Sequence, residues 1–150
     1  MENILIRQAN ASEQKELEQL QMRASLTNAG DRDALLAHPD AVEVPFEQIT
    51  GGRVFVAESQ GTILGFAAVE PRPDGDSELD ALFVDPEIRR RGVGRLLVEH
   101  CIEIARTRGS AALCVIGNPH AQDFYNSCGF KLTGTTETRF GPGLLMRVMV

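Results

Sequence analysis

Residues 89–94, which read Arg-Arg-Arg-Gly-Val-Gly, carry the clearest chemical signal in the sequence. They follow an apolar run at 82–84 and precede apolar residues at helical spacing, so we expect a strand, a turn and then a helix to about residue 108. The first N–H groups of a helix lack partners within it, and the helix dipole places partial positive charge there. Arginines add full charge, and glycines let a ligand approach the backbone. The turn is therefore a candidate pyrophosphate-binding site.

Other interpretations of this turn are open. A tight strand–helix connection with solvated arginines would have the same composition. Two known phosphate loops do not fit, because the sequence lacks GxxxxGK[ST], and Gly92-Val93-Gly94 is followed by Arg95, Leu96 and Leu97 rather than by the third glycine of GxGxxG.

Two motifs resemble one family, the GNAT N-acetyltransferase superfamily. Residues 89–94 match its [Q/R]xxGx[G/A] signature, with Arg90 at a position where many members have glycine. The segment NPHAQDFYNSCGF resembles the family's NxxAxxFYxxxGF segment at Asn118, Ala121, Phe124, Tyr125, Gly129 and Phe130. Two motifs in the right order are far more specific than either alone.

The remaining sequence predicts one domain over residues 1–150. We expect strands at 3–9, 53–59, 62–70, 77–84, 111–116, 129–137 and 144–150. We expect helices from residue 10 or 12 to about 27, at 32–37 with Asp31 as its cap, at 93–108 and at 119–127 with Asn118 as its cap. Residues 39–52 are either irregular or contain one brief helix at 45–49. This order resembles the GNAT order, which implies an α/β (α+β) fold: a mixed twisted β-sheet of about seven strands flanked by about four helices.

The resemblance implies acetyl-CoA as co-substrate and assigns roles to residues. Tyr125 would protonate the departing sulfur, and Glu78 would act as the base for the amine, with Asp80 or water in reserve. The residues implied in cofactor binding are Leu82, Phe83, Val84, Arg89, Arg90, Arg91, Gly92, Val93, Gly94, Arg95, Asn118, Ala121, Phe124 and Tyr125.

The expected activity is transfer of the acetyl group of acetyl-CoA to a primary amine by direct attack. The acceptor, a small-molecule or peptide amine, is not identified, although the acids at 74, 76, 78 and 80 favour a cationic one. One alternative is a non-catalytic acyl-CoA-binding or sensor domain. Another is a module whose arginine turn binds an acidic protein.

Composition narrows the classes further. The net charge of −6 argues against nucleic-acid binding. No apolar run reaches the roughly 18 residues of a membrane span, and the N-terminus lacks a signal-peptide pattern, so we expect a cytoplasmic protein. The histidines lack metal-ligand spacing, so we expect no metal. A homodimer is compatible with the sequence. We expect Cys101, Cys114 and Cys128 to be reduced thiols, and we expect Cys101 and Cys114 to lie in the core.

Overall fold

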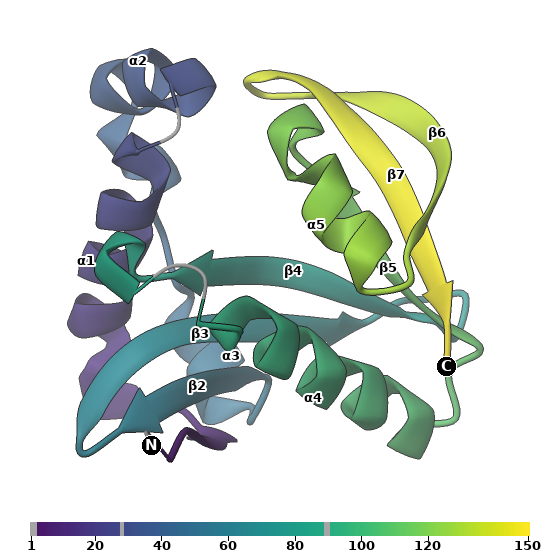
Figure 1. The fold of residues 1–150 in the computed structure, drawn as a ribbon, viewed down its shortest axis with the longest axis horizontal. Coiled ribbons are helices and arrows are strands. Elements are labelled where there is room, and N and C mark those ends of the chain that lie inside the picture. The colour runs from purple at the N-terminus through teal and green to yellow at the C-terminus, as the bar shows by residue number, and fades with distance from the viewer. Residues whose placement is uncertain (1–2, 28, 89–90) are drawn as a thin grey trace. The chain divides into compact units, whose positions relative to one another are not determined.

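The structure, a computed structural model, describes residues 3–27, 29–88 and 91–150. Over these residues it contains a seven-stranded mixed sheet, in the order β1-β2-β3-β4-β5-β7-β6, and five α-helices (Figure 1). The predicted mixed sheet is confirmed, and the brief helix considered at 45–49 is present as the fifth α-helix of the described residues. The elements are β1 (Leu5–Gln8), α1 (Gln14–Leu26), α2 (Ala29–Ala37), α3 (Phe46–Thr50), β2 (Val54–Ser59), β3 (Thr62–Pro71), β4 (Ser77–Val84), α4 (Val93–Thr107), β5 (Ala112–Gly117), α5 (Gln122–Ser127), β6 (Lys131–Thr138) and β7 (Gly141–Met149).

The chain forms two compact units. The first comprises Met1–Ala68 with Ala81–Leu97, and the second comprises Val69–Asp80 with Val98–Val150. The elements β3, β4 and α4 each contribute residues to both units. A single domain over residues 1–150 therefore stays a prediction.

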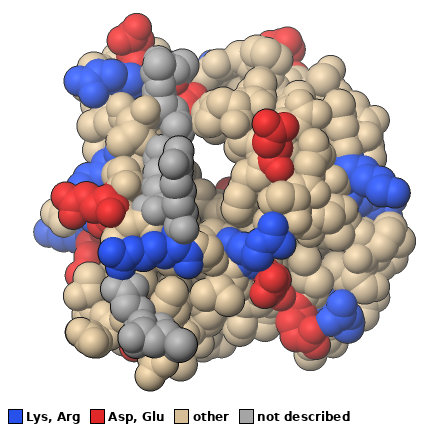
Figure 2. All heavy atoms as spheres, viewed as in Figure 1, with Lys and Arg blue, Asp and Glu red and all other residues tan. Residues whose placement is uncertain are grey.

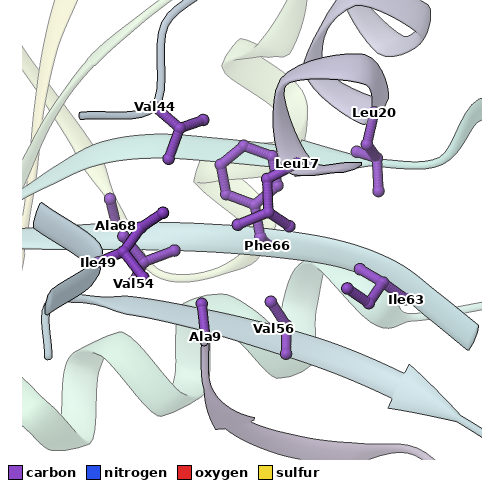
Figure 3. Packing of buried hydrophobic residues seen from close by; sticks show 10 residues of the cluster. All are labelled: Ala9, Leu17, Leu20, Val44, Ile49, Val54, Val56, Ile63, Phe66 and Ala68. Atoms are coloured by element: carbon purple, nitrogen blue, oxygen red, sulfur yellow. The ribbon is translucent and has the colours of Figure 1, made fainter. Parts of the chain in front are cut away.

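The core of the first unit forms between α1 and the strands β2 and β3. Leu17 and Leu20 of α1 are buried and meet Phe66 of β3 in one apolar cluster (Figure 3). Phe83 of β4 packs against the same cluster, and the centroids of its ring and the Phe66 ring lie 5.6 Å apart. The end of β4 is therefore anchored in the core, ahead of the arginine- and glycine-rich turn.

Asp85 holds the chain where it leaves β4. Its N–H donates to the carbonyl oxygen of Leu64 at 2.8 Å. Its carboxylate accepts from the guanidinium of Arg23 on α1 at 3.0 Å and from the N–H of Glu87 at 3.1 Å. These bonds fix the direction in which the chain enters the turn.

The second unit is built on β5. Its neighbour β4 runs parallel to it through the pairs Ser77↔Leu113, Glu78↔Cys114 and Leu79↔Val115. Its other neighbour, β7, runs antiparallel and forms a long hairpin with β6 (Figure 1). The strand predicted at 111–116 is thus confirmed, and it is parallel to β4. Register places residues from four strands side by side.

Some predicted boundaries are wrong. Helix α2 begins at Ala29, so Asp31 lies in its first turn and does not cap it, and Asn28 lies outside the described residues. The helix dipole favours an acidic residue both at the cap and in the first turn. The sequence alone therefore could not distinguish these two positions for Asp31. Asn118 does precede a helical segment, but that segment opens as a 3₁₀ turn, Pro119–Ala121, and the Asn118 side chain makes no capping hydrogen bond.

The described residues contain neither a membrane-spanning helix nor a metal-binding cluster. Within 3–27, 29–88 and 91–150 there is no helix with the length and hydrophobicity that a membrane span requires. The same residues contain no group of three or more His, Cys, Asp or Glu side chains placed to hold a metal ion.

Candidate active site

The described part of the turn before α4 is open to a ligand. Gly92 has φ +78° and nothing within 4 Å of the position that a Cβ would take. Its carbonyl oxygen accepts from the N–H of Leu96 at 3.0 Å, so the helix begins directly after it. The N–H groups of the first turn then have no intrahelical acceptor. Arg91 and Arg95 are exposed beside them, which suits an anionic ligand, and Arg89 and Arg90 lie outside the described residues.

The last residues of β4, predicted to bind the cofactor through their backbone, are half-buried. Leu82, Phe83 and Val84 belong to the first unit, with the turn and the start of α4. The structure thus brings the first group of predicted cofactor residues, 82–84 with 91–95, into one unit. The second group, 118–125, belongs to the other unit.

Tyr125 lies against β5 in an aromatic cluster. It is 8% exposed, and its ring makes edge-to-face contacts with Phe124 and Phe130, at centroid distances of 5.3 and 5.4 Å. A Cβ on Gly117, at the end of β5, would lie 3.1 Å from Cε2 of the ring, so only glycine fits there without moving it. Burial raises the pKa of the phenol to about 12, so Tyr125 remains a proton donor at any ordinary pH.

Glu78 lines a cavity of about 370 Å³ in the second unit. Its carboxylate is half-buried and makes no hydrogen bond or ion pair with the described residues. Burial raises the pKa of Glu78, the nearby negative charge of Asp80 raises it further, and Arg72 acts in the opposite direction. A carboxylate with a raised pKa is a stronger base than an exposed one.

The other charged residues of this cavity pair with one another. Arg72 contacts Asp74 at 3.0 Å, and Arg147 contacts Asp76 at 3.2 Å. The second oxygen of Asp76 accepts from the N–H of Ala112 at 3.1 Å. Two of the four acids on which the expectation of a cationic acceptor rests are therefore balanced by arginines, and Glu78 is the one in the cavity with no such partner.

Sequence reasoning missed most of this cavity. Cys114, expected in the core, is half-buried and lines the cavity, whereas Cys101 is buried as expected and its thiol pKa rises to about 12. Arg147 and Ile116 also line it without having been singled out. These residues come together through the register between strands, and patterns in a single sequence do not reveal that register. The lining residues are Arg72, Asp74, Asp76, Glu78, Cys114, Val115, Ile116, Thr133, Leu145, Met146 and Arg147.

The predicted base, Glu78, and the predicted acid, Tyr125, adjoin residues of β5 that face opposite sides of the sheet. Glu78 is paired with Cys114 and shares its face of the sheet, whereas Gly117, which contacts Tyr125, is three residues further along β5 and points to the other face.

On the face shown in Figure 2, acidic and basic side chains form small separate groups, and other residues make up most of the surface. The charges visible on this face are therefore mixed in sign.

Comparison with known proteins identifies the family. Residues 16–130 match the model of the Acetyltransferase (GNAT) family. The chain is 42% identical over 59 residues to the peptidyl-lysine N-acetyltransferase YjaB of Salmonella typhimurium, a match that covers 39% of this chain and 39% of that protein's length.

Two solved structures share the fold. A GCN5-related N-acetyltransferase from Rhodopseudomonas palustris superposes with a TM-score of 0.81 at 20% identity, covering 100% of this chain and 98% of the other. The PaiA N-acetyltransferase from Thermoplasma acidophilum, solved in complex with coenzyme A, gives 0.79 at 16% identity and 99% coverage of both chains. With the family match over most of its length, this chain belongs to the acetyltransferase (GNAT) family.

Proposed function

We propose that the chain transfers the acetyl group of acetyl-CoA to a primary amine by direct attack. The observation that carries the proposal is Glu78, a carboxylate in a cavity with a raised pKa and no hydrogen-bond or ion-pair partner in the described part of the chain. Family membership supports acetyl transfer. The relative with 42% identity is named for peptidyl-lysine, and the acceptor here is a peptide lysine or a small-molecule amine.

In this mechanism Glu78 accepts a proton from the acceptor ammonium, directly or through one water. The amine nitrogen then forms a bond with the thioester carbonyl carbon, and the carbon–sulfur bond breaks. Tyr125 donates its proton to the departing sulfur, which leaves CoA as a neutral thiol. The nitrogen loses its second proton to solvent as the amide forms, and Tyr125 takes a proton back from solvent. Both groups lie beside β5, Glu78 through its pair Cys114 and Tyr125 against Gly117, which supports roles for both in one reaction.

The cofactor residues follow from the family motif and the open turn. The pyrophosphate is assigned to residues 89–95, where the start of α4 supplies free N–H groups and Gly92 leaves space. The pantetheine arm is assigned to the backbone of 82–84, paired as an added strand. Asn118, Ala121 and Phe124 are assigned to the thiol end, around Tyr125. The solved relative with coenzyme A is consistent with this cofactor.

A CoA-binding domain without catalysis is the competing function. Such a domain has no use for an unpartnered carboxylate held partly out of water, since that arrangement costs stability. Glu78 therefore favours the enzyme.

The test is a thiol-release assay with acetyl-CoA and a panel of primary amines, with the acetylated product identified by mass spectrometry. We expect wild-type turnover, and we expect Tyr125→Phe to lower kcat by about tenfold or more while acetyl-CoA affinity stays within a few-fold. The variant keeps the ring, so its melting temperature should hardly change. Tight acetyl-CoA binding without acetylation of any amine would favour the sensor function instead.

A further inference from the structure

In the cavity of the second unit, the acidic Glu78 and the basic Arg147 belong to one row of side chains across the sheet. Glu78 pairs with Cys114 in the β4–β5 ladder, and Cys114 pairs with Arg147 in the β5–β7 ladder. Paired residues on adjacent strands share a face, so the three side chains form one row across three strands. With strands about 4.8 Å apart, the backbone positions of Glu78 and Arg147 lie about 10 Å apart.

Arg147 is held by one ion pair, and its guanidinium has further N–H donors available for a ligand. One Nη2–H donates to Asp76, whose side chain is 15% exposed and whose other oxygen is fixed by the N–H of Ala112. A guanidinium has five N–H donors in a planar fork, and the described residues give Arg147 no other acceptor. Its side chain remains 43% exposed. An arginine fixed on one side and open on the other is suited to bind a carboxylate.

Arg72 differs in a way that provides a control. It lines the same cavity and carries the same charge, but its partner Asp74 is 50% exposed, whereas Asp76, the partner of Arg147, is 15% exposed. Exposed pairs of this kind are worth little and hold their members loosely.

An apolar surface lies beside the charged row. Ile116 and Leu145 are paired in the β5–β7 ladder, two residues along each strand from Cys114 and Arg147, and both line the cavity. Ile116 is 49% exposed, which is unusual for an isoleucine on an interior strand. This surface suits the aliphatic part of a small ligand.

We infer that the acceptor is a small amino acid-like molecule, in which a short aliphatic spacer joins the amine that Glu78 deprotonates to a carboxylate that Arg147 binds. The inference rests on the proposed function and narrows it, because a lysine inside a peptide has no carboxylate at this distance. Arg147 is thus a residue that determines acceptor specificity.

The experiment compares amines that differ only in the carboxylate. One series contains β-alanine, 4-aminobutyrate, 5-aminopentanoate and 6-aminohexanoate, and the matched series contains the alkylamines of the same length. A further pair is Nα-acetyl-lysine and its amide. For the best length we expect kcat/KM to be about tenfold or more higher with the carboxylate, the range expected of a charge-assisted hydrogen bond.

Arg147→Gln should remove this preference, so that the ratio of kcat/KM between paired amines falls close to one, while kcat/KM for the alkylamines changes little. Arg72→Gln, which removes the same charge from the same cavity, should keep most of the preference. Asp76→Asn, which releases Arg147 from its ion pair, should give an intermediate ratio. A merely structural role for Arg147 would lower both series alike and would overturn the inference.

The outcomes also separate the inference from the function on which it rests. Acetylation of alkylamines or of the lysine amide as fast as of their carboxylated partners would contradict the inference and leave the acetyltransferase proposal intact. No acetylation in either series, with acetyl-CoA bound, would contradict both.

Discussion

At the scale of single residues, the acidic side chains of the cavity differ in their hydrogen-bond partners. Asp76 has both oxygens engaged, one by the N–H of Ala112 and one by the guanidinium of Arg147. Glu78 is two residues away and has no such partners in the described structure, although it is partly withdrawn from water. The same side-chain chemistry therefore serves structure at Asp76 and, as we propose, catalysis at Glu78.

The raised pKa of Glu78 leads to a prediction that couples activity with stability. The carboxylate is the basic form, so kcat/KM should rise with pH through the raised pKa, and Glu78→Gln should lower kcat/KM and remove this rise. Because the folded-state pKa lies above the unfolded value, the stability contributed by this group is present at acid pH and is lost as the pH rises through the folded pKa. Glu78→Gln should therefore melt at a higher temperature than wild type at pH 7.

The matched control for this prediction is Asp80→Asn, which removes an exposed carboxylate from the same face of β4. We expect it to change activity much less than Glu78→Gln, as measured by the thiol-release assay between pH 5 and pH 9, with thermal melts at each pH. Loss of activity in Asp80→Asn alone would transfer the role of base to Asp80. A lower melting temperature for Glu78→Gln at pH 7 would mean that Glu78 stabilises the fold.

At the scale of elements, the end of β5 and the helix α5 position Tyr125 together. The ring rests where the Cβ of residue 117 would otherwise lie, and the carbonyl oxygen of Tyr125 accepts from the N–H of Phe130 at 3.0 Å. The strand end, the helix and the start of the following strand segment thus constrain the ring from three sides. A change that moves the ring without removing it tests whether its position matters.

Gly117→Ala is that change. The added Cβ would lie 3.1 and 3.2 Å from two ring carbons, so the ring must shift by a few tenths of an ångström. We expect kcat to fall by about three- to tenfold, at a stability cost of about 1–3 kcal/mol. Gly134→Ala on β6 is the matched control, because its Cβ would meet its nearest atom at an ordinary 3.6 Å. Equal kcat in the two variants would mean that the ring position is not critical.

Elements with strong local signals could be predicted from the sequence, and arrangements across strands could not. The strand at 77–84, the glycine turn and the helix from Val93 follow from an apolar run, positive-φ chemistry and helical spacing, and all three match the structure. The start of α2 was misplaced because Asp31 suits a first turn as well as a cap. The cavity was missed because its residues come from separate strands, and Cys114 and Arg147 meet only through register.

At the scale of the whole molecule, the proposed cofactor-binding residues divide between the two compact units. Residues 82–95 belong to the first unit, and residues 118–125 to the second. The chain passes from one unit to the other within β3, β4 and α4, which are continuous elements. A ligand that binds the folded chain is expected to stabilise it, whichever of these groups of residues holds it.

Thermal unfolding measures this stabilisation directly. Acetyl-CoA at a hundred times its Kd should add about 2.7 kcal/mol to the free energy of unfolding, which for a chain of this size corresponds to a rise in Tm of about 5–10 °C. Gly94→Asp places a carboxylate at the start of α4, where the pyrophosphate is assigned, and it should abolish most of this rise. Ser12→Asp adds the same charge at an exposed position of the first unit and should keep the full rise. The Tm of each variant without ligand shows whether it is folded, and calorimetry gives its acetyl-CoA affinity. A folded Gly94→Asp protein with the wild-type rise in Tm would show that the cofactor does not bind at this turn.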